Sequence, residues 1–383
     1  RNIDRLYKIL YNNKQFGSDN MKVVVGMSGG VDSAVSAYLL DKEGYEVIGL
    51  FMKNWDSNIN NDPEGITDGI CPQEQDFKDA KSVCDYLGIP LYRVDFIKEY
   101  WELVFAYFLD ELKKGRTPNP DIMCNKYIKF DLFKKEAKKL GADLIATGHY
   151  ARLEHGRLLR GVDNNKDQTY FLSQVKPSEF KDVLFPVGGL TKPEVREIAL
   201  NANLPVAEKK DSTGICFIGE RHYQEFVNNY IKGKEGDIVD IDTMKVIGKH
   251  HGLMNYTIGQ RRNVGLSGDQ KRHYVCGKDT EKNILYVAFG DDNKYLMSNE
   301  AVIESMNYIS DLKPTFATCK FRYRGEDVPI TIEYISDNEV IVKYESAKAV
   351  TPGQACVIYL GSEVIGGGII KEVRKDNTKL WYL

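Results

Sequence analysis

The chain has 383 residues, which at roughly 100–200 residues per domain suggests two or three domains. Hydrophobic residues make up 42% and charged residues 28%, and the strongest apolar run, 47–52, is only strand-sized, so neither a membrane-spanning nor a secreted protein is indicated. The net charge of −3 argues against a general polyanion binder. Seven cysteines without a Cys-x-x-Cys pair argue against a disulfide framework or a zinc ribbon, and they favour a reducing cytosol, so we expect a cytoplasmic protein.

Predicted strands and helices alternate between residues 21 and 150. Continuously apolar segments predict buried parallel strands, at 23–25, 46–52, 91–94 and 143–147. Apolar residues at helical spacing predict helices between them, at 34–43, 77–87, 101–114 and 130–140. This alternation is typical of a doubly wound α/β sheet.

The pattern changes after residue 150. Residues 152–160 predict a hairpin, and Thr191-Lys192-Pro193-Glu194 is a capping box that opens a helix ending at Asn201. From Gly236 onward, short turn-bounded segments rich in β-forming residues predict two small β domains, the last a barrel.

These elements predict three domains behind a short N-terminal segment. The segment is expected to be an extension or an expression remnant, and the domains are α/β, small and β-rich, and a C-terminal β-barrel. The predicted boundaries are 1–20, 21–227, 228–292 and 293–383.

Local charge is more informative than the net charge. Nine Lys and Arg residues against three acids lie between Lys113 and Lys139, and four against Asp269 alone lie between Gln260 and His273. Such local basic surfaces suit a partner that docks on one face, although a solvated helix face is the alternative.

A glycine-rich hexapeptide, Ser28-Gly29-Gly30-Val31-Asp32-Ser33, separates the first predicted strand from the first helix. This is where α/β sheets bind phosphates, because glycines let the backbone approach an anion and the helix N-terminus carries partial positive charge. Ser28 and Ser33 add hydroxyl donors, and Asp32 could help to hold Mg²⁺. The segment matches neither a Walker loop nor a dinucleotide motif. It is similar to the pyrophosphate loop of enzymes that split ATP into AMP and pyrophosphate.

A second motif, residues 117–126, places Cys124 in a polar, proline-bounded loop three residues after Asp121. Lys126 and the basic helix behind it supply positive potential that favours a thiolate, and the carboxylate could act as a general acid or base. Reactive and structural cysteine remain open as alternatives for this residue.

A third motif, residues 209–221, contains Cys216 after a basic, glycine-containing stretch that could lower the thiol pKa. Cys216 is too far along the chain from Cys124 for a local metal knuckle, but the two can meet in space. From the residues alone it is equally a structural cysteine. The other five cysteines lie mostly in helix or strand patterns and are predicted to be structural, at 71, 84, 276, 319 and 356.

Five motifs, in this order, resemble the bacterial tRNA-specific 2-thiouridylases within the ATP pyrophosphatase (PP-loop) superfamily, from about Lys22 to the C-terminus. They are Gly26-Met27-Ser28-Gly29-Gly30-Val31-Asp32-Ser33, Phe51-Met52-Lys53-Asn54-Trp55, Gly115-Arg116-Thr117-Pro118-Asn119-Pro120-Asp121, Ala146-Thr147-Gly148-His149-Tyr150-Ala151-Arg152 and Asp211-Ser212-Thr213-Gly214-Ile215-Cys216-Phe217-Ile218-Gly219-Glu220-Arg221.

The resemblance implies ATP- and Mg²⁺-dependent replacement of oxygen by sulfur at position 2 of the wobble uridine in tRNAs for Lys, Glu and Gln. Adenylation turns the carbonyl oxygen into part of a leaving group. A cysteine persulfide then carries the sulfur, and a second thiol reduces the persulfide or attacks the base. By position, Cys216 resembles the persulfide carrier, Cys124 the nucleophile and Asp121 the acid/base partner, although the assignments could be exchanged. A cysteine desulfurase or sulfur-relay protein is the implied sulfur donor.

The resemblance also implies ligand contacts, and no protein-bound metal cluster. The residues implied to bind ATP are Gly26, Met27, Ser28, Gly29, Gly30, Val31, Asp32, Ser33, Met52 and Gly148. The residues implied to contact tRNA are Asn119, Pro120, Asp121, His149, Lys166, Asp167, Gln168, Arg322, Tyr323 and Gln354. By residue type alone, His149 could be a packed residue, 166–168 a polar turn, and Arg322-Tyr323 an exposed strand face, while Gln354 has no independent support.

Two other hypotheses fit parts of the sequence. A pyrophosphate-loop ligase acting on a small molecule would need neither the cysteines nor RNA. An RNA-binding protein with a vestigial nucleotide loop would produce no AMP.

Overall fold

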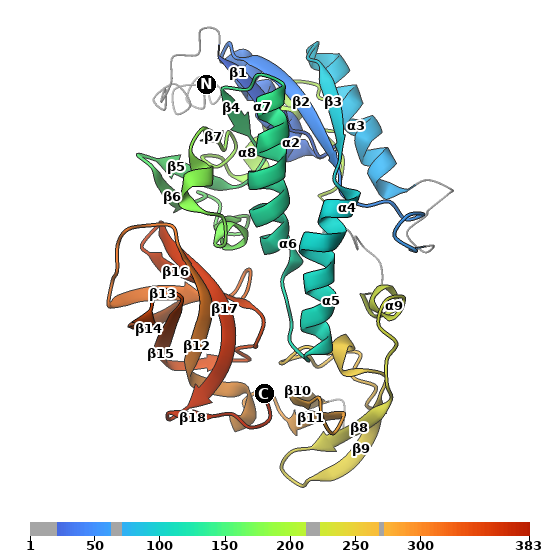
Figure 1. Cartoon of the computed structure of the whole chain (residues 1–383), viewed down its shortest axis with the longest axis vertical. Helices are drawn as coiled ribbons and strands as arrows, with labels where there is room; N and C mark the ends of the chain where they lie inside the picture. The colour runs from blue at the N-terminus through green and yellow to red at the C-terminus, as the bar shows by residue number, and fades with distance from the viewer. Residues whose placement is uncertain (1–20, 63–70, 212–222, 268–271) are drawn as a thin grey trace.

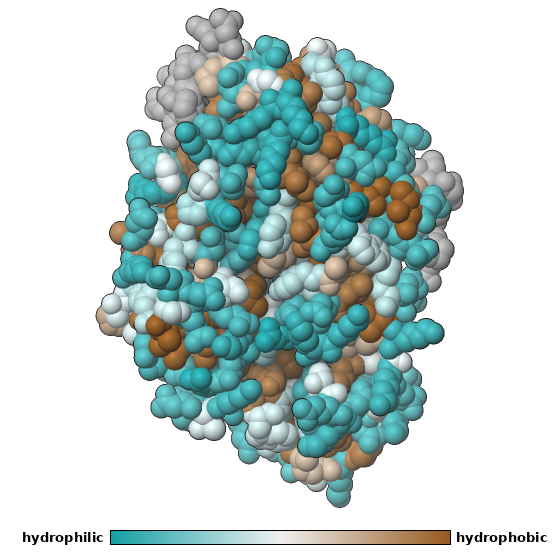
Figure 2. Space-filling model, viewed as in Figure 1, coloured by the Kyte–Doolittle hydropathy of each residue, from teal (hydrophilic) through white to brown (hydrophobic). Residues whose placement is uncertain are grey.

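The computed structural model describes residues 21–62, 71–211, 223–267 and 272–383. A parallel sheet with its helices occupies one end of the molecule in Figure 1, and the C-terminal barrel and a small central sheet lie side by side at the other end. Hydrophilic residues predominate on the face drawn in Figure 2, where hydrophobic residues occur in separate groups. In the described part of the chain, no helix has both the length and the apolar character needed to span a bilayer.

The parallel sheet has the strand order β3-β2-β1-β4-β7. Its strands are β1 (Lys22–Gly26), β2 (Glu46–Lys53), β3 (Leu91–Asp95), β4 (Leu144–Ala146) and β7 (Val183–Leu184). All four pairings are parallel. The order reverses between β1 and β4, and such a switch point is where doubly wound sheets bind ligands.

Both faces of β1 are buried, which explains its unbroken apolar sequence. Val23 and Val25 belong to a core cluster with α2 (Val31–Lys42), α3 (Pro72–Leu87) and α8 (Lys192–Asn201). Val24 belongs to a second cluster, formed with the helices on the opposite face. Those helices are α4 (Ile97–Tyr100), α5 (Ala106–Lys113), α6 (Pro120–Met123) and α7 (Phe133–Lys139).

Two π-helical segments interrupt the helices on this second face, η2 (Trp101–Phe105) and η3 (Cys124–Leu132). The helix predicted at 101–114 therefore begins with a π-helical segment, which hydrophobic periodicity does not reveal. The capping box predicted at Thr191 is present at the start of α8. The sheet-and-helix arrangement confirms the predicted doubly wound α/β fold.

Short elements connect the parallel sheet to the rest of the chain. The predicted hairpin is present as β5 (Ala151–Glu154) and β6 (Arg157–Arg160). Single 3-10 turns η4 (Thr169–Leu172) and η5 (Pro177–Phe180) precede β7, and α9 (Tyr223–Asn228) leads into the central sheet. That sheet has the order β10-β11-β8-β9. Its strands are β8 (Gly236–Asp240), β9 (Lys245–His250), β10 (His273–Asp279) and β11 (Ile284–Phe289), with 3-10 turns η6 (Leu253–Asn255) and η8 (Lys294–Leu296) beside it.

The C-terminal strands close into the predicted barrel. The order β12-β15-β14-β13-β16-β17 is closed by pairing of β12 with β17. The strands are β12 (Met297–Tyr308), β13 (Phe316–Lys320), β14 (Val328–Ser336), β15 (Glu339–Lys348), β16 (Ala355–Leu360) and β17 (Glu363–Lys375), and β18 (Thr378–Lys379) pairs with β17.

The barrel packs against the α/β domain through one face of β16. Because successive strand residues point to opposite faces, Cys356 and Ile358 lie in the barrel core, whereas Val357 and Tyr359 belong to the large core beneath the parallel sheet. β17 also pairs with β6 at Glu363 and Leu159, so the hairpin extends the barrel sheet. The β domains thus share an apolar core with the α/β domain.

Candidate nucleotide and tRNA-modification site

The glycine-rich loop joins β1 to α2 at the switch point of the parallel sheet. Gly29 has a φ of 73°, which favours glycine, and the Ser28 and Ser33 hydroxyls lie 3.1 Å apart. The Ser33 hydroxyl donates to the Gly30 carbonyl and accepts from the Ser28 amide. Gly30 is the N-cap of α2 and provides no side-chain cap, so the first N–H groups of α2 remain available to an anion.

Gly148, just past β4, packs directly against the start of α2. A Cβ at this position would lie 2.9 Å from the Asp32 carbonyl carbon and 2.9 Å from the Ser33 nitrogen. Of the other residues expected to bind ATP, Gly26 and Met27 are buried at the end of β1, and Met52 is half-buried near the end of β2. The residues expected to bind ATP therefore converge on the carboxyl edge of β1, β2 and β4.

Asp32 is already engaged by two partners that the sequence did not identify. Its Oδ1 accepts a hydrogen bond from the Tyr150 hydroxyl at 2.8 Å and from Lys192 Nζ at 2.6 Å. The Lys192 ammonium also lies 2.9 Å from Asp211, which in turn pairs with Lys166. Asp32 as a Mg²⁺ ligand stays a prediction. In this structure Asp32 positions Lys192 at the glycine-rich loop of residues 28–33, which we call the phosphate loop.

The charges of this network shift the pKa values of its members. Burial alone would raise the pKa of Asp211, but hydrogen bonds from Lys166 and Lys192 hold it well below its usual range. Burial, followed by the charge of Asp32, raises the pKa of Tyr150. Asp211 thus stays ionised and Tyr150 stays protonated. The only sequence signal for Lys192 was its place at the start of a capped helix.

A second lysine, Lys209, reaches the phosphate loop from the other side. Its ammonium donates to the Gly29 carbonyl at 3.1 Å and pairs with Asp76 and Asp79 of α3. Burial lowers the pKa of Lys209, but the hydrogen bonds with the two aspartates outweigh this and raise it. Lys209 therefore remains cationic beside the loop, where phosphates would bind, and the Lys192 ammonium lies beside the same loop through its contact with Asp32.

Cys124 lies at the junction of α6 and the π-helical η3, not in a polar loop as expected. Its side chain is 2% exposed and belongs to the same core cluster as Ile122 and Ile128. Asn119 caps α6 by accepting from the Asp121 amide at 3.1 Å, with Pro120 at the first helical position. The polar residues and prolines predicted a loop, and this prediction was wrong. Asn119 caps α6 and Pro120 occupies its first position, so the segment leads into a helix. π-Helical segments are frequent at functional sites.

The loop before α6 is held by the C-terminal barrel. Gln354 Nε2 donates to the Thr117 carbonyl at 2.7 Å, and the Thr117 amide donates to the Pro352 carbonyl at 3.0 Å. Lys126 Nζ lies 3.5 Å from Gln174 Oε1, whose amide nitrogen donates to barrel carbonyls. Gln354 thus positions the segment that carries Asn119, Pro120 and Asp121, and its contact with tRNA stays a prediction.

Three residues expected to contact tRNA are buried: Pro120 in α6, His149 and Asp167. His149 packs between Phe130 and Phe185 and its Nδ1 lies 2.7 Å from the Thr147 hydroxyl. Burial lowers the pKa of His149 far below its ordinary value, so the imidazole is neutral. Asp167 is also buried and binds the Gly161 amide and the Thr169 hydroxyl.

The remaining expected RNA contacts are brought together at the junction of hairpin and barrel. Gln168 Oε1 accepts from the Tyr150 amide, which fixes the 166–168 turn against the phosphate-loop region. Tyr323 packs on Phe171, with ring centroids 4.3 Å apart, and its neighbour Arg322 is exposed. The turn and the Arg322-Tyr323 pair, far apart in sequence, therefore flank one junction.

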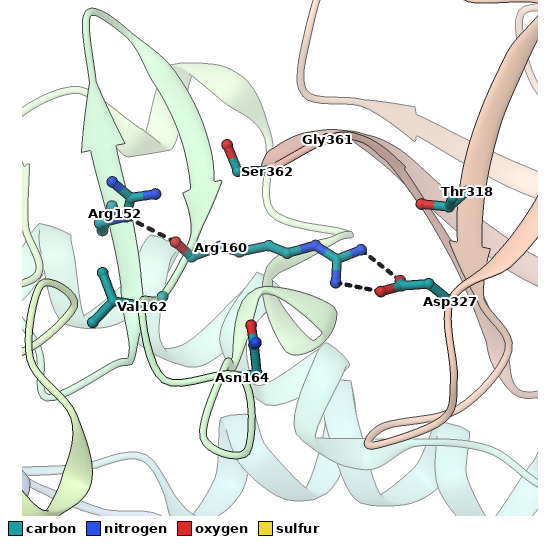
Figure 3. A pocket seen from close by; sticks show the side chains of 9 residues that line it. Arg152, Arg160, Val162, Asn164, Thr318, Asp327, Gly361 and Ser362 are labelled. Carbon is teal, nitrogen blue, oxygen red and sulfur yellow. Dashed lines mark hydrogen bonds and ion pairs between the residues drawn. The ribbon is translucent and has the colours of Figure 1, made fainter.

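An arginine from the hairpin fixes this junction. In Figure 3 the Arg160 guanidinium extends from β6 to Asp327 of the barrel, with hydrogen bonds of 2.6 and 2.9 Å. The same guanidinium lies over the Tyr359 ring, 3.7 Å from its centroid. Arg152 and Asn164 line the hollow beside this pair. The barrel is thereby fixed in position relative to the α/β domain.

Cys216 lies outside the described residues, so its position relative to Cys124 stays a prediction. Asp211, the last described residue before it, belongs to the Lys192 network at the phosphate loop. The six described cysteines are free thiols and all are buried. Burial raises the pKa of Cys84 to about 12, which agrees with its predicted structural role.

Fold and site together define a nucleotide-binding enzyme with a phosphate loop and two appended β domains. Family models match the three parts in order: the tRNA methyl transferase HUP domain at residues 21–220, its PRC-barrel domain at 224–289, and the aminomethyltransferase beta-barrel domain at 298–370.

Curated relatives narrow this class. The chain is 53% identical over 366 residues to the tRNA-specific 2-thiouridylase MnmA of Mycoplasmopsis synoviae, covering 94% of this chain and 98% of that protein. It is 51% identical over 372 residues to the protein of the same name from Lysinibacillus sphaericus, covering 95% and 97%. The chain belongs to the tRNA-specific 2-thiouridylase family, which confirms the family expected from the five motifs.

Proposed function

We propose that this protein is an ATP-dependent tRNA 2-thiouridylase acting on the wobble uridine of tRNAs for Lys, Glu and Gln. The reaction adenylates the 2-carbonyl oxygen, releases pyrophosphate, and then exchanges the adenylated oxygen for sulfur, which releases AMP. The observation that carries the proposal is the chain of contacts from Asp32 through Lys192 to Asp211. It connects the phosphate loop to Asp211, which belongs to the motif that contains the second cysteine, Cys216.

The residues around the loop fit a nucleotide triphosphate. Uncapped N–H groups of α2 and the Ser28 hydroxyl would bind phosphate oxygens, and Lys192 and Lys209 would offset their charge. Mg²⁺, when bound with ATP, would neutralise further phosphate charge, with Asp32 as the candidate ligand. Tyr150 and Lys192 orient the Asp32 carboxylate for this role.

Sulfur would move between two cysteines. The terminal sulfur of a Cys216 persulfide attacks carbon 2 of the adenylated base, and AMP leaves with the former carbonyl oxygen. The Cys124 thiol then attacks Cys216 Sγ, which breaks the S–S bond to the base and leaves a disulfide that a cellular thiol reduces. Asp121 would exchange protons with the base. The two cysteines could exchange roles without changing the products.

The tRNA anticodon arm would bind across the α/β and barrel domains. Asn119, Pro120 and Asp121 would hold the flipped uridine, while Arg322 and Tyr323 offer a cation and an aromatic ring to the backbone and a base. His149, Lys166, Asp167, Gln168 and Gln354 would position these segments or contact the RNA. A cysteine desulfurase or a sulfur-relay protein would recharge the persulfide.

A reconstitution tests the proposal. The protein is mixed with Mg-ATP, unmodified glutamate tRNA and a persulfide donor, and the anticodon nucleoside is examined by mass spectrometry. We expect a sulfur-for-oxygen mass gain that is lost in Cys124→Ser and Cys216→Ser but retained in Cys71→Ser, because Cys71 is a buried residue at the N-cap position of α3 whose Sγ accepts from the Ser57 hydroxyl. No gain in wild-type protein that binds the tRNA would refute the proposal. AMP formation that survives both cysteine substitutions without RNA would indicate a small-molecule ligase.

A further inference from the structure

The central domain carries an exposed arginine cluster that the proposed reaction does not use. Arg261, Arg262 and Arg272 line one hollow of about 560 Å³ together with His273. All three arginines are exposed, and none of them forms an ion pair with another residue that the structure describes. We refer to these three residues and their hollow as the arginine hollow.

The other basic segment noted in the sequence behaves differently. Between Lys113 and Lys139, Lys114 pairs with Asp110 at 2.6 Å, Lys135 with Asp131 at 2.5 Å, and Lys139 with Glu136 at 2.6 Å. Arg116 and Lys134 are also ion-paired, so about half of the positive charge of this segment is offset locally. The charge of the arginine hollow remains available to a partner.

The backbone beneath the arginine hollow is held in place by its own contacts. Gln260 accepts from the Thr257 amide at 3.0 Å and donates to the Arg262 carbonyl at 2.9 Å. Val264 is buried in the central core, and the Arg272 carbonyl accepts from the Gly290 amide at 3.0 Å. Arginines on such a fixed backbone lose less conformational entropy on binding than those on an unrestrained loop.

The chemistry of the hollow favours phosphate. Guanidinium groups present forked donors that match phosphate oxygens. Among the residues that the structure describes, the lining contains no carboxylate, and Asp240, the acid beside His273, is bound to that histidine at 3.0 Å and to Thr243. An open, exposed hollow with three separate cations suits several phosphates of a polymer better than one enclosed anion.

We infer that the arginine hollow binds backbone phosphates of the tRNA, as a contact region separate from the loop that holds the target base. This inference rests on the proposed function for the identity of the RNA. The hollow belongs to the domain of β8–β11, which Figure 1 shows at the opposite end of the molecule from the phosphate-loop sheet. Contact there would orient a large RNA without touching the reacting base.

The test compares two triple variants with the same change in charge. The first replaces Arg261, Arg262 and Arg272 by Ala. The control replaces Lys81, Lys98 and Lys343 by Ala, each of which already pairs with a neighbouring acid. Binding of unmodified tRNA is measured by fluorescence anisotropy between 50 and 200 mM salt.

We expect the arginine variant to lose affinity about tenfold or more at low salt and to lower the salt slope by about 2 to 3, because about 0.7 to 0.9 counterions are released per phosphate contact. The control should stay within about twofold of wild type. In the thiolation assay, the arginine variant should raise the KM for tRNA and leave kcat unchanged. A triple Arg→Lys variant keeps the positive charge but not the forked guanidinium donors. Its affinity for tRNA should lie between those of wild type and the Ala variant, and it serves as a control for misfolding.

Three results would overturn the inference. The first is unchanged affinity and salt slope in the Ala variant. The second is a fall in kcat without a change in KM. The third is unchanged tRNA binding with slower sulfur transfer from a protein donor, which would assign the hollow to an acidic protein. Failure of the proposed function is separable, because wild-type protein would then bind tRNA with salt dependence but form no thiolated product.

Discussion

Replacing Gly148 by Ala tests whether the close contact between β4 and α2 positions the phosphate loop. The added methyl group would lie 2.9 Å from two backbone atoms at the start of α2, about half an ångström closer than ordinary contacts allow. Backbone atoms cannot rotate away as a side chain does, so α2 or the segment after β4 must shift. Overpacking of this kind costs about 1–3 kcal/mol, which corresponds to a fall in Tm of roughly 2–12 °C for a domain of this size.

The functional consequence should exceed the loss of stability. A shift of α2 moves the N–H groups of the phosphate loop, so we expect a higher KM for ATP in tRNA-dependent AMP formation. Gly189→Ala is the matched control, because apart from its chain neighbours no atom of the described residues lies within 4 Å of the Cβ it adds. If Gly148→Ala matched Gly189→Ala in both Tm and KM for ATP, the close contact would not position the loop, and our reasoning would be wrong.

Three further predictions concern buried or ion-paired groups. Lys192→Met should raise the KM for ATP about 10- to 150-fold, the equivalent of about 1.5–3 kcal/mol for a charged hydrogen bond, while Lys192→Arg should retain part of the affinity; equal KM values for Met and wild type would contradict this. Cys124, at 2% exposure, should react slowly with iodoacetamide in the free enzyme and faster once tRNA and ATP bind, as followed by peptide mass spectrometry; fast alkylation of the free enzyme would count against the described packing. Burial lowers the pKa of Lys278 to about 7 from 10.5. Between these two pH values the folded protein binds fewer protons than the unfolded chain, so its stability rises with pH. The destabilisation caused by Lys278 is therefore largest below about pH 7. Lys278→Met should therefore raise Tm more at about pH 6 than at about pH 9, and a gain independent of pH would refute the assignment.

The parallel sheet and the barrel were predictable because their signals are local. Strands buried on both faces, such as β1 and β2, read as continuous apolar runs, and the glycines of the phosphate loop lie between a strand and a helix as the fold requires. Five ordered motifs then identified the family, since each motif serves a part of one reaction. The capping box at Thr191 fixed the start of α8 for the same reason, because its hydrogen bonds join near neighbours in sequence.

The tertiary structure decided what the polar residues do. Asp32 and Asp211 are 179 positions apart, and only folding brings Lys192 between them, so no local pattern could reveal the network. Cys124 lies in a polar sequence yet is buried. The side chain of Asn119 caps α6, and the residues that follow in the helix, Cys124 among them, pack into the core. The two basic segments look alike in sequence, and only the fold shows that several cations of one are ion-paired while the arginines of the other are exposed. Pairing between charges depends on distance in space, which the order of residues along the chain does not specify.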